Sequence, residues 1–183
     1  MVLEAEWSEI EYTVTYTAFG ETVCTQTYGY GDAIELPDEY AVPGYAFAGW
    51  DTGKAAVESD MKVAAIYSVT VTLASDHALQ AEGVSFTGND EAGYFGSYTA
   101  EGSSEEDFAF ALSAAASGYT QFGWWREADG AWTNVVSLAG LDGQTVWALW
   151  ITDFTASVTY AQKQNKSGFE GIWYSIKYDY NIE

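Results

Sequence analysis

A seven-residue motif, Gly-Tyr-x-x-x-Gly-Trp, occurs twice in the chain and limits its possible folds more than any other feature. It spans residues 44–50 and 118–124, and its Gly, Tyr, Gly and Trp match at a constant offset of 74 residues. Similarity at a fixed spacing indicates an array of related units. Glycine accepts backbone conformations that a side chain forbids, and Trp offers a large ring for burial. The motif therefore predicts structural anchors at eight positions: Gly44, Tyr45, Gly49, Trp50, Gly118, Tyr119, Gly123 and Trp124.

Two further patterns recur around the motif and define the limits of the units. An aliphatic residue, Ala and an aromatic residue occupy alternate positions in 63–67 and in 146–150, at an offset of 83 residues, and again in 3–7. Alternation places these side chains on one face of a strand, so each segment is predicted to close a unit. A β-branched, alternating segment follows each of them, at 12–16, 69–73 and 156–160, and is predicted to open the next unit.

The repeated patterns predict a mainly β chain, α+β at most, made of tandem modules with about four strands each. The chain would begin on the last strand of a module, so we expect it to be a fragment whose secretion signal lies upstream. The predicted modules are residues 1–9 (closing strand of a preceding repeat), 10–68 (module 1), 69–154 (module 2, with an insertion near 88–107) and 155–183 (start of a further module or a terminal β cap).

Within the modules, the position of each strand follows from alternation and from glycine-containing turns such as Phe19-Gly20. In module 1 we expect strands near 11–19, 22–30, 45–51 and 62–68; in module 2 we expect them near 69–74, 83–87, 119–125 and 145–151. The polar, Gly-rich insertion is expected to be a loop or hairpin. The Ala-rich segment 108–116 is expected to form a short helix.

The order of these patterns resembles the Listeria–Bacteroides repeat, the B-repeat type found in internalin B. The elements in that order are residues 12–16, Gly31-Asp32, Leu36-Pro37, 44–50 and 63–67. Module 2 departs from the pattern by its insertion and by Gln121, with Phe122 displaced one place from the usual Phe position. The resemblance implies small β-grasp-like modules, repeated along extracellular cell-surface proteins and adhesins, in contact with adjacent repeats of the same chain and without catalytic activity.

The charge of the chain excludes several classes of partner. The formal net charge is −21, from 27 acidic and 6 basic residues. Nucleic acids are excluded because phosphate binding needs clustered Lys and Arg. Membrane insertion is not expected, since no apolar run approaches the roughly 20 residues of a membrane span. Such a charge keeps a surface solvated and keeps copies of a protein apart.

Catalytic and metal-binding motifs are missing from the sequence. It contains no nucleophile elbow and no phosphate-binding loop, so we predict that the chain is not an enzyme. Cys24 and His77 are the only residues of their types and are predicted to lie in different modules, which argues against a thiol site and against zinc. The acidic clusters at 58–60, 89–91 and 105–107 lack the spacing of an EF-hand loop. No cofactor is predicted.

Some aromatic side chains cannot face the core, and these are the candidate binding residues. Trp124 and Trp125 are adjacent, so on a strand their rings point to opposite sides. Trp132 follows a predicted turn, and Tyr94 falls in the insertion. Exposed rings beside carboxylates stack on sugars; the alternative is packing against a neighbouring unit. We therefore expect a structural spacer or stalk, and keep open a module that binds a host or neighbouring-cell glycan or protein through Tyr94, Trp125 and Trp132.

Overall fold

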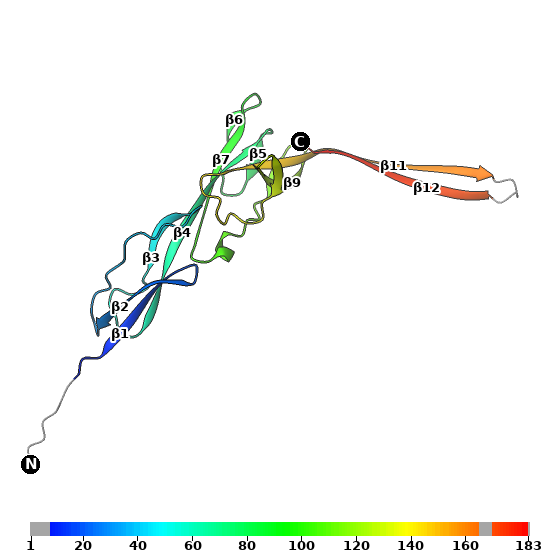
Figure 1. Cartoon of the computed structure of the whole chain (residues 1–183). Coiled ribbons are helices and arrows are strands. Elements are labelled where there is room, and N and C mark those ends of the chain that lie inside the picture. The colour runs from blue at the N-terminus through cyan, green and yellow to red at the C-terminus, as the bar shows by residue number, and fades with distance from the viewer. Residues whose placement is uncertain (1–7, 165–169, 183) are drawn as a thin grey trace, which may run out of the picture. The chain divides into compact units, whose positions relative to one another are not determined.

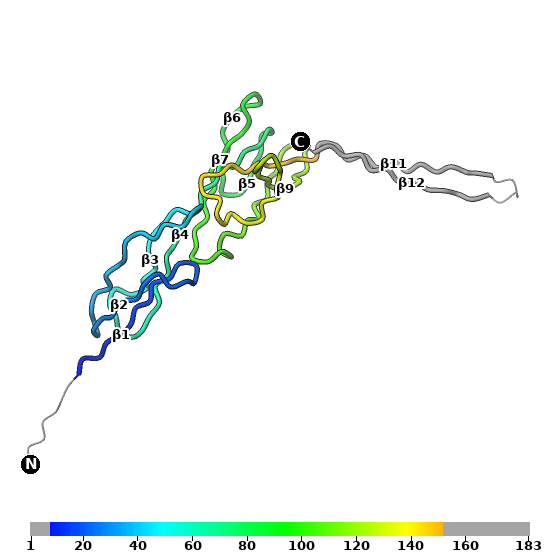
Figure 2. Tube along the Cα trace, viewed as in Figure 1, coloured from blue at the N-terminus to red at the C-terminus, as the bar shows by residue number. Residues whose placement is uncertain are grey.

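The structure, a computed structural model, describes the backbone of residues 8–164 and 170–182 and the side chains of residues 8–151 (Figures 1 and 2). This part of the chain is mainly β, with a single 3-10 turn, η1, and no α-helix. The elements are β1 (Glu11–Ala18), β2 (Glu21–Gly29), β3 (Ala46–Asp51), β4 (Met61–Ser75), β5 (Leu79–Ala81), β6 (Thr87–Asn89), β7 (Gly93–Gly102), η1 (Glu105–Phe108), β8 (Ala114–Ala116), β9 (Thr120–Ala128), β10 (Ala131–Asn134), β11 (Thr145–Gln164) and β12 (Glu170–Ile182).

Most strands belong to one mixed sheet, and the prediction of a mainly β chain is confirmed. Its order is β10-β9-β11-β4-β1-β2, with β12 beside β11, β3 and β7 beside β4, and β6 beside β7. The short strands β5 and β8 form a separate pair. The description of the chain as tandem β-grasp-like modules stays a prediction.

The contacts within the chain define two compact units, each assembled from separate stretches of sequence. Unit 1 comprises Met1–Val71, Tyr98–Ala111 and Val136–Gln144. Unit 2 comprises Thr72–Ser97, Leu112–Val135 and Thr145–Glu183. These units describe packing, whereas the modules describe sequence similarity, and the module boundaries stay a prediction.

The core of unit 1 forms where β1, β2, β3 and the first part of β4 meet (Figure 1). The buried residues Val14 and Tyr16 of β1 alternate with more exposed neighbours, as expected for a strand with one face inward. They pack with Val57 and Val63, which have no exposed surface. Phe108 and Leu138, from the two later segments of unit 1, are also fully buried. Residues far apart in the sequence therefore complete this core.

Segment 108–116 is extended, and the short helix expected there is wrong. Phe108 and Phe110 are both buried, which is the period of a strand and not of a helix. Phe110 N donates to Val136 O at 2.8 Å, and Leu138 N donates to Phe108 O at 2.8 Å. These hydrogen bonds to the 136–138 segment replace the ones a helix would make. The insertion does form a hairpin, of β6 and β7.

The two ends of the chain were assigned to partial modules. Segment 3–7, the expected closing strand of a preceding repeat, lies outside the described residues. Segment 156–160 lies in β11, whose backbone pairs antiparallel with β12 from Ile151↔Ile182 to Gln164↔Glu170. A strand is thus present where the opening strand of a further module is predicted.

Candidate functional site

The two copies of the motif lie on strands that pair in the same register. On β3 and β4, Gly49 is opposite Ile66 and Trp50 is opposite Ala65. On β9 and β11, Gly123 is opposite Leu149 and Trp124 is opposite Ala148. Each β9 residue is 74 positions after its β3 counterpart, and each β11 residue is 83 positions after its β4 counterpart. Any residue of one pair of strands can therefore be compared directly with its equivalent in the other.

Both copies contain a β-bulge immediately before the second glycine. Ala48 in β3 and Phe122 in β9 have no partner of their own, so two residues face one on the neighbouring strand. Gly49 and Gly123 follow them with φ of 142° and 141°, a conformation that L side chains rarely adopt. The glycines thus permit the bulge, and the bulge shifts by one residue which side chains face each side of the strand.

The tryptophans that follow these glycines point into the two units. Trp124 is 4 % exposed, and its Nε1 donates to Leu112 O at 2.7 Å. Trp50 is half-buried; its Nε1 donates to Pro37 O at 3.0 Å, and its ring meets Tyr16 edge-on at 5.4 Å. In both copies the indole packs against the interior and anchors a loop by its N–H.

Tyr45 belongs to an aromatic cluster in unit 1. Its ring lies 4.8 Å from Phe19, 5.9 Å from Tyr67 and 5.2 Å from Phe108, measured between centroids. Burial raises the pKa of its hydroxyl, and the nearby Glu105 carboxylate adds to the rise. The preceding Gly44 has φ of 83°, and a Cβ there would lie 2.5 Å from Gly140 O. This geometry serves packing.

Tyr119, the equivalent residue in unit 2, has different surroundings. Its ring stacks on His77 at a centroid distance of 3.9 Å, and Gly118 before it has φ of 86°. Both rings line a hollow of about 460 Å³, together with Asp76, Ala78, Asp90 and Ser117. The motif tyrosine therefore lies at the core in one unit and at a surface hollow in the other.

A row of aromatic side chains lies on the outer face of the unit 2 sheet. Directly paired residues of antiparallel strands point to the same face. Trp125 is paired with Trp147 on one side and with Asn134 on the other, and Trp132 is paired with Glu127, two residues along β9 from Trp125. Their neighbours Trp124, Val146, Ala148 and Trp150 are buried on the inner face. Trp125, Trp132 and Trp147 therefore share the outer face.

Two phenylalanines extend this row. Phe122, turned outward by the bulge, stacks on Trp125 with centroids 5.4 Å apart and planes within 4°. Phe95 of β7 meets Trp147 edge-on at 6.3 Å. Phe95 is 39 % exposed, Phe122 43 % and Trp132 47 %. We call the set of Phe95, Phe122, Trp125, Trp132 and Trp147 the aromatic face.

The corresponding face of unit 1 is not aromatic. Ala48 stands where unit 2 has Phe122, Asp51 stands at the place of Trp125, and Ala64 at the place of Trp147. The inward positions, in contrast, hold Trp50 and Trp124, or Tyr67 and Trp150, in both copies. The aromatic face is thus a difference between two copies of one backbone arrangement.

Of the three candidate binding residues, the structure brings Trp125 and Trp132 together on this face but places Tyr94 apart from them. Tyr94 alternates with Phe95 on β7, and its hydroxyl donates to Asp90 Oδ1 at 2.6 Å. That hydrogen bond raises the pKa of the Tyr94 hydroxyl. Asp90 lines the hollow beside His77 and Tyr119, so Tyr94 is associated with the hollow.

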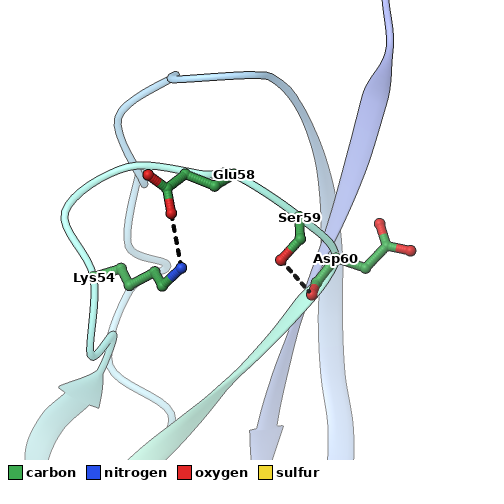
Figure 3. Close-up of polar contacts among 4 residues, drawn as sticks. All are labelled: Lys54, Glu58, Ser59 and Asp60. Carbon is green, nitrogen blue, oxygen red and sulfur yellow. Dashed lines mark hydrogen bonds and ion pairs between the residues drawn. The ribbon is translucent and has the colours of Figure 1, made fainter.

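The acidic clusters are held by local contacts. At the loop before β4, Lys54 Nζ and Glu58 Oε2 form an exposed ion pair at 2.8 Å, which lowers the pKa of Glu58 (Figure 3). The Asp60 carboxylate points away from that pair in Figure 3 and accepts from Thr13 N at 2.8 Å. Asp107 accepts from the backbone N–H groups of Ser103 and Ser104. Within residues 8–151, no three His, Cys, Asp or Glu side chains are grouped as metal ligands.

Residues 12–82 match the Listeria-Bacteroides repeat domain. This segment is a Listeria-Bacteroides repeat domain. The resemblance predicted from the sequence is confirmed there, and it covers β1 to β5. Neither a curated protein nor a solved structure matches the chain.

The match gives a general class of protein. Listeria-Bacteroides repeat domains are typical of cell-surface proteins, and no catalytic family is identified. None of the helical segments in the described part of the chain has the length and apolar character needed to cross a membrane.

Proposed function

We propose that this chain is a non-catalytic repeat region of an extracellular surface protein or adhesin and acts as a spacer or stalk. The observation that carries the proposal is the way one copy of the strand arrangement continues into the next. In β1 and β4, Tyr16 pairs in parallel with Val63; in β4 and β11, Leu73 pairs in parallel with Val146. The opening strands are offset by 57 residues and the closing strands by 83.

Strand β4 serves both copies without a break. Its residues 64–68 pair with β3, and its residues 72–74 pair with β11. Strand β11 likewise continues past its pairing with β9 into its pairing with β12. Such a connection can be repeated any number of times without a new linker, which suits a spacer whose length is set by copy number.

Surface display tests the spacer function. Cells would display an epitope tag on one copy or on two copies of this chain, and binding of an antibody and of its smaller Fab fragment would be measured. Two copies should increase antibody binding more than Fab binding, because the tag lies farther from the cell wall. An equal response of both probes to copy number would contradict the spacer proposal.

A second function, binding of a carbohydrate or protein, is supported by the aromatic face. Five aromatic side chains gather on one side of the unit 2 sheet, and three of their equivalents in unit 1 are Ala or Asp. A spacer needs no such difference between copies, whereas exposed aromatic patches mark interaction sites. The two functions are compatible, since a stalk can carry a binding face.

A further inference from the structure

We infer that the aromatic face of unit 2 binds a neutral polysaccharide; this inference rests on the second of the two proposed functions. The rings belong to four strands: Phe95 to β7, Phe122 and Trp125 to β9, Trp132 to β10 and Trp147 to β11. Cross-strand pairing holds them on one face, and the Trp125 and Phe122 planes are parallel within 4°. The result is an extended set of ring surfaces.

The chemistry of these rings fits sugars. The faces of aromatic rings carry partial negative charge and attract the weakly positive C–H groups of a pyranose. In the described part of the chain, Trp125 Nε1 is covered and has no hydrogen-bond partner, so this ring offers its apolar surface. Glu127 and Asn134, exposed on the same face, supply polar groups for sugar hydroxyls. Stacking surfaces and hydrogen-bonding groups thus occur side by side.

Charge complementarity selects among possible partners. Glu127 is the charged residue of this face on β9, and the neighbouring Arg126 points to the opposite side. With a net charge of −21 on the chain, an acidic polysaccharide and a second copy of the chain are both repelled. A neutral polysaccharide meets no such repulsion, and its hydroxyl groups can donate to the Glu127 carboxylate.

The difference between the two copies supplies a well-matched variant. Replacing Phe122→Ala, Trp125→Asp and Trp147→Ala gives unit 2 the residues that unit 1 carries at the same register positions. Because the same bulge and pairing accept those residues in unit 1, the triple variant should keep the fold. Trp132→Ala is a milder second variant, since this ring is nearly half exposed. Tyr30→Ala, which removes a 70 % exposed ring from unit 1, is the control.

Retention on insoluble cellulose, β-1,3-glucan and mannan would be measured first, with polygalacturonate as the acidic comparison. The hexasaccharide of the polymer that retains the chain would then be titrated while Trp fluorescence is recorded. We expect retention by at least one neutral polymer and none by polygalacturonate. Trp132→Ala should weaken binding about tenfold, and the triple variant should abolish it.

The outcomes separate this inference from the proposed function. Tyr30→Ala should bind as the parent does, and circular dichroism should show that every variant is folded. Retention by no neutral polymer, equal binding by the folded triple variant, or a concentration-dependent dimer lost in that variant would each overturn the inference. A folded chain that binds no sugar would still be compatible with the spacer, which is tested by copy number.

Discussion

Gly49 and Gly123 show how a single residue can decide the geometry of a repeat. Both have φ near 141° and both follow the extra residue of a bulge. They differ in surroundings. A Cβ at Gly49 would meet nothing within 4 Å, whereas a Cβ at Gly123 would lie 3.0 Å from Asn134 Nδ2 and 3.3 Å from Trp125 Nε1. The backbone requirement is shared, and the steric one belongs to unit 2.

Replacement of each glycine by Ala separates these two requirements. Gly49→Ala should lower the free energy of unfolding by about 1–3 kcal/mol through backbone strain alone. Gly123→Ala should cost more, because Asn134 or Trp125 must also move. Urea denaturation of both variants checks the order. Equal stability of Gly49→Ala and the parent would show that the bulge does not need glycine.

The buried tyrosines of unit 1 predict instability at alkaline pH. Burial is the main reason that the pKa values of Tyr16 and Tyr67 lie above the ordinary value near 10. A pKa higher in the folded than in the unfolded chain means that stability is complete below about pH 10 and is lost as the pH rises above it. Melting temperatures from pH 7 to 11 should therefore fall beyond about pH 10.

Tyr67→Phe tests the assignment of that effect. The Tyr67 hydroxyl donates to Tyr40 O at 2.8 Å, so the variant should lose about 1 kcal/mol at neutral pH. Its stability should then fall less steeply with pH than that of the parent, whereas Tyr30→Phe, at an exposed ring, should follow the parent curve. Identical slopes for Tyr67→Phe and the parent would assign the alkaline loss to other groups.

At the scale of elements, the β1–β2 turn shows a local preference overruled by packing. Phe19 and Gly20 connect Ala18 to its partner Glu21 with φ of 47° and 84°, the pattern of a type I′ turn. Asn is far better suited to the first position than Phe. The Phe19 ring, however, lies 4.8 Å from both Tyr45 and Tyr67. The aromatic contacts hold Phe in a conformation that its backbone disfavours.

Phe19→Asn measures which contribution is larger. Loss of two close aromatic pairs, each worth about 0.5–1.5 kcal/mol, should outweigh the relief of roughly 1 kcal/mol in the turn. We expect a lower melting temperature. The matched control is Asp129→Asn in the β9–β10 turn, where Asp129 and Gly130 have φ of 53° and 76°; it should melt like the parent. A more stable Phe19→Asn variant would contradict the dominance of packing.

Strand positions were predictable where alternation and turn residues agree. The expected strands near 11–19, 22–30 and 45–51 correspond to β1, β2 and β3. The helix at 108–116 was wrong because Ala favours helices locally, while the burial of Phe108 and Phe110 imposes an extended chain. Long-range packing decided that segment, and sequence periodicity does not contain it.

The candidate site was predicted in part, for a related physical reason. The adjacency of Trp124 and Trp125 already indicates that one ring points outward. Strict alternation, however, puts Phe122 on the same side as Trp124, and the bulge reverses this. Trp147 was overlooked because it lies beside residues that serve the core. Comparison of each residue with its equivalent, Ala48 or Ala64, contains the missing signal.

At the scale of the whole molecule, sequence similarity and packing divide the chain differently. The Listeria-Bacteroides repeat domain ends at residue 82, but unit 1 also contains Tyr98–Ala111 and Val136–Gln144. Phe108 and Leu138 within these segments are fully buried. In addition, Asp142 N donates to Gly44 O at 3.0 Å, and Gly143 N donates to Thr70 O at 2.8 Å. The later segments are part of the unit.

Truncation tests their contribution. A chain of residues 8–82 lacks the Phe108 and Leu138 side chains, and loss of a buried Phe or Leu typically costs about 2–5 kcal/mol. The fragment should therefore melt well below the full chain or be unfolded at 25 °C, as measured by circular dichroism. A fragment with the stability of the full chain would show that the matched domain folds independently.

The dispersed composition of unit 1 also has a consequence in time. A chain synthesised or exported from its N-terminus presents β1 to β4 early, but the last segment of unit 1 ends at Gln144. Folding of a domain during synthesis needs all of its parts outside the ribosome. The core residues of β1 to β4 must therefore wait, partly uncovered, while most of unit 2 is made. Chaperone contact should be greatest in that interval and should end once residue 144 has emerged.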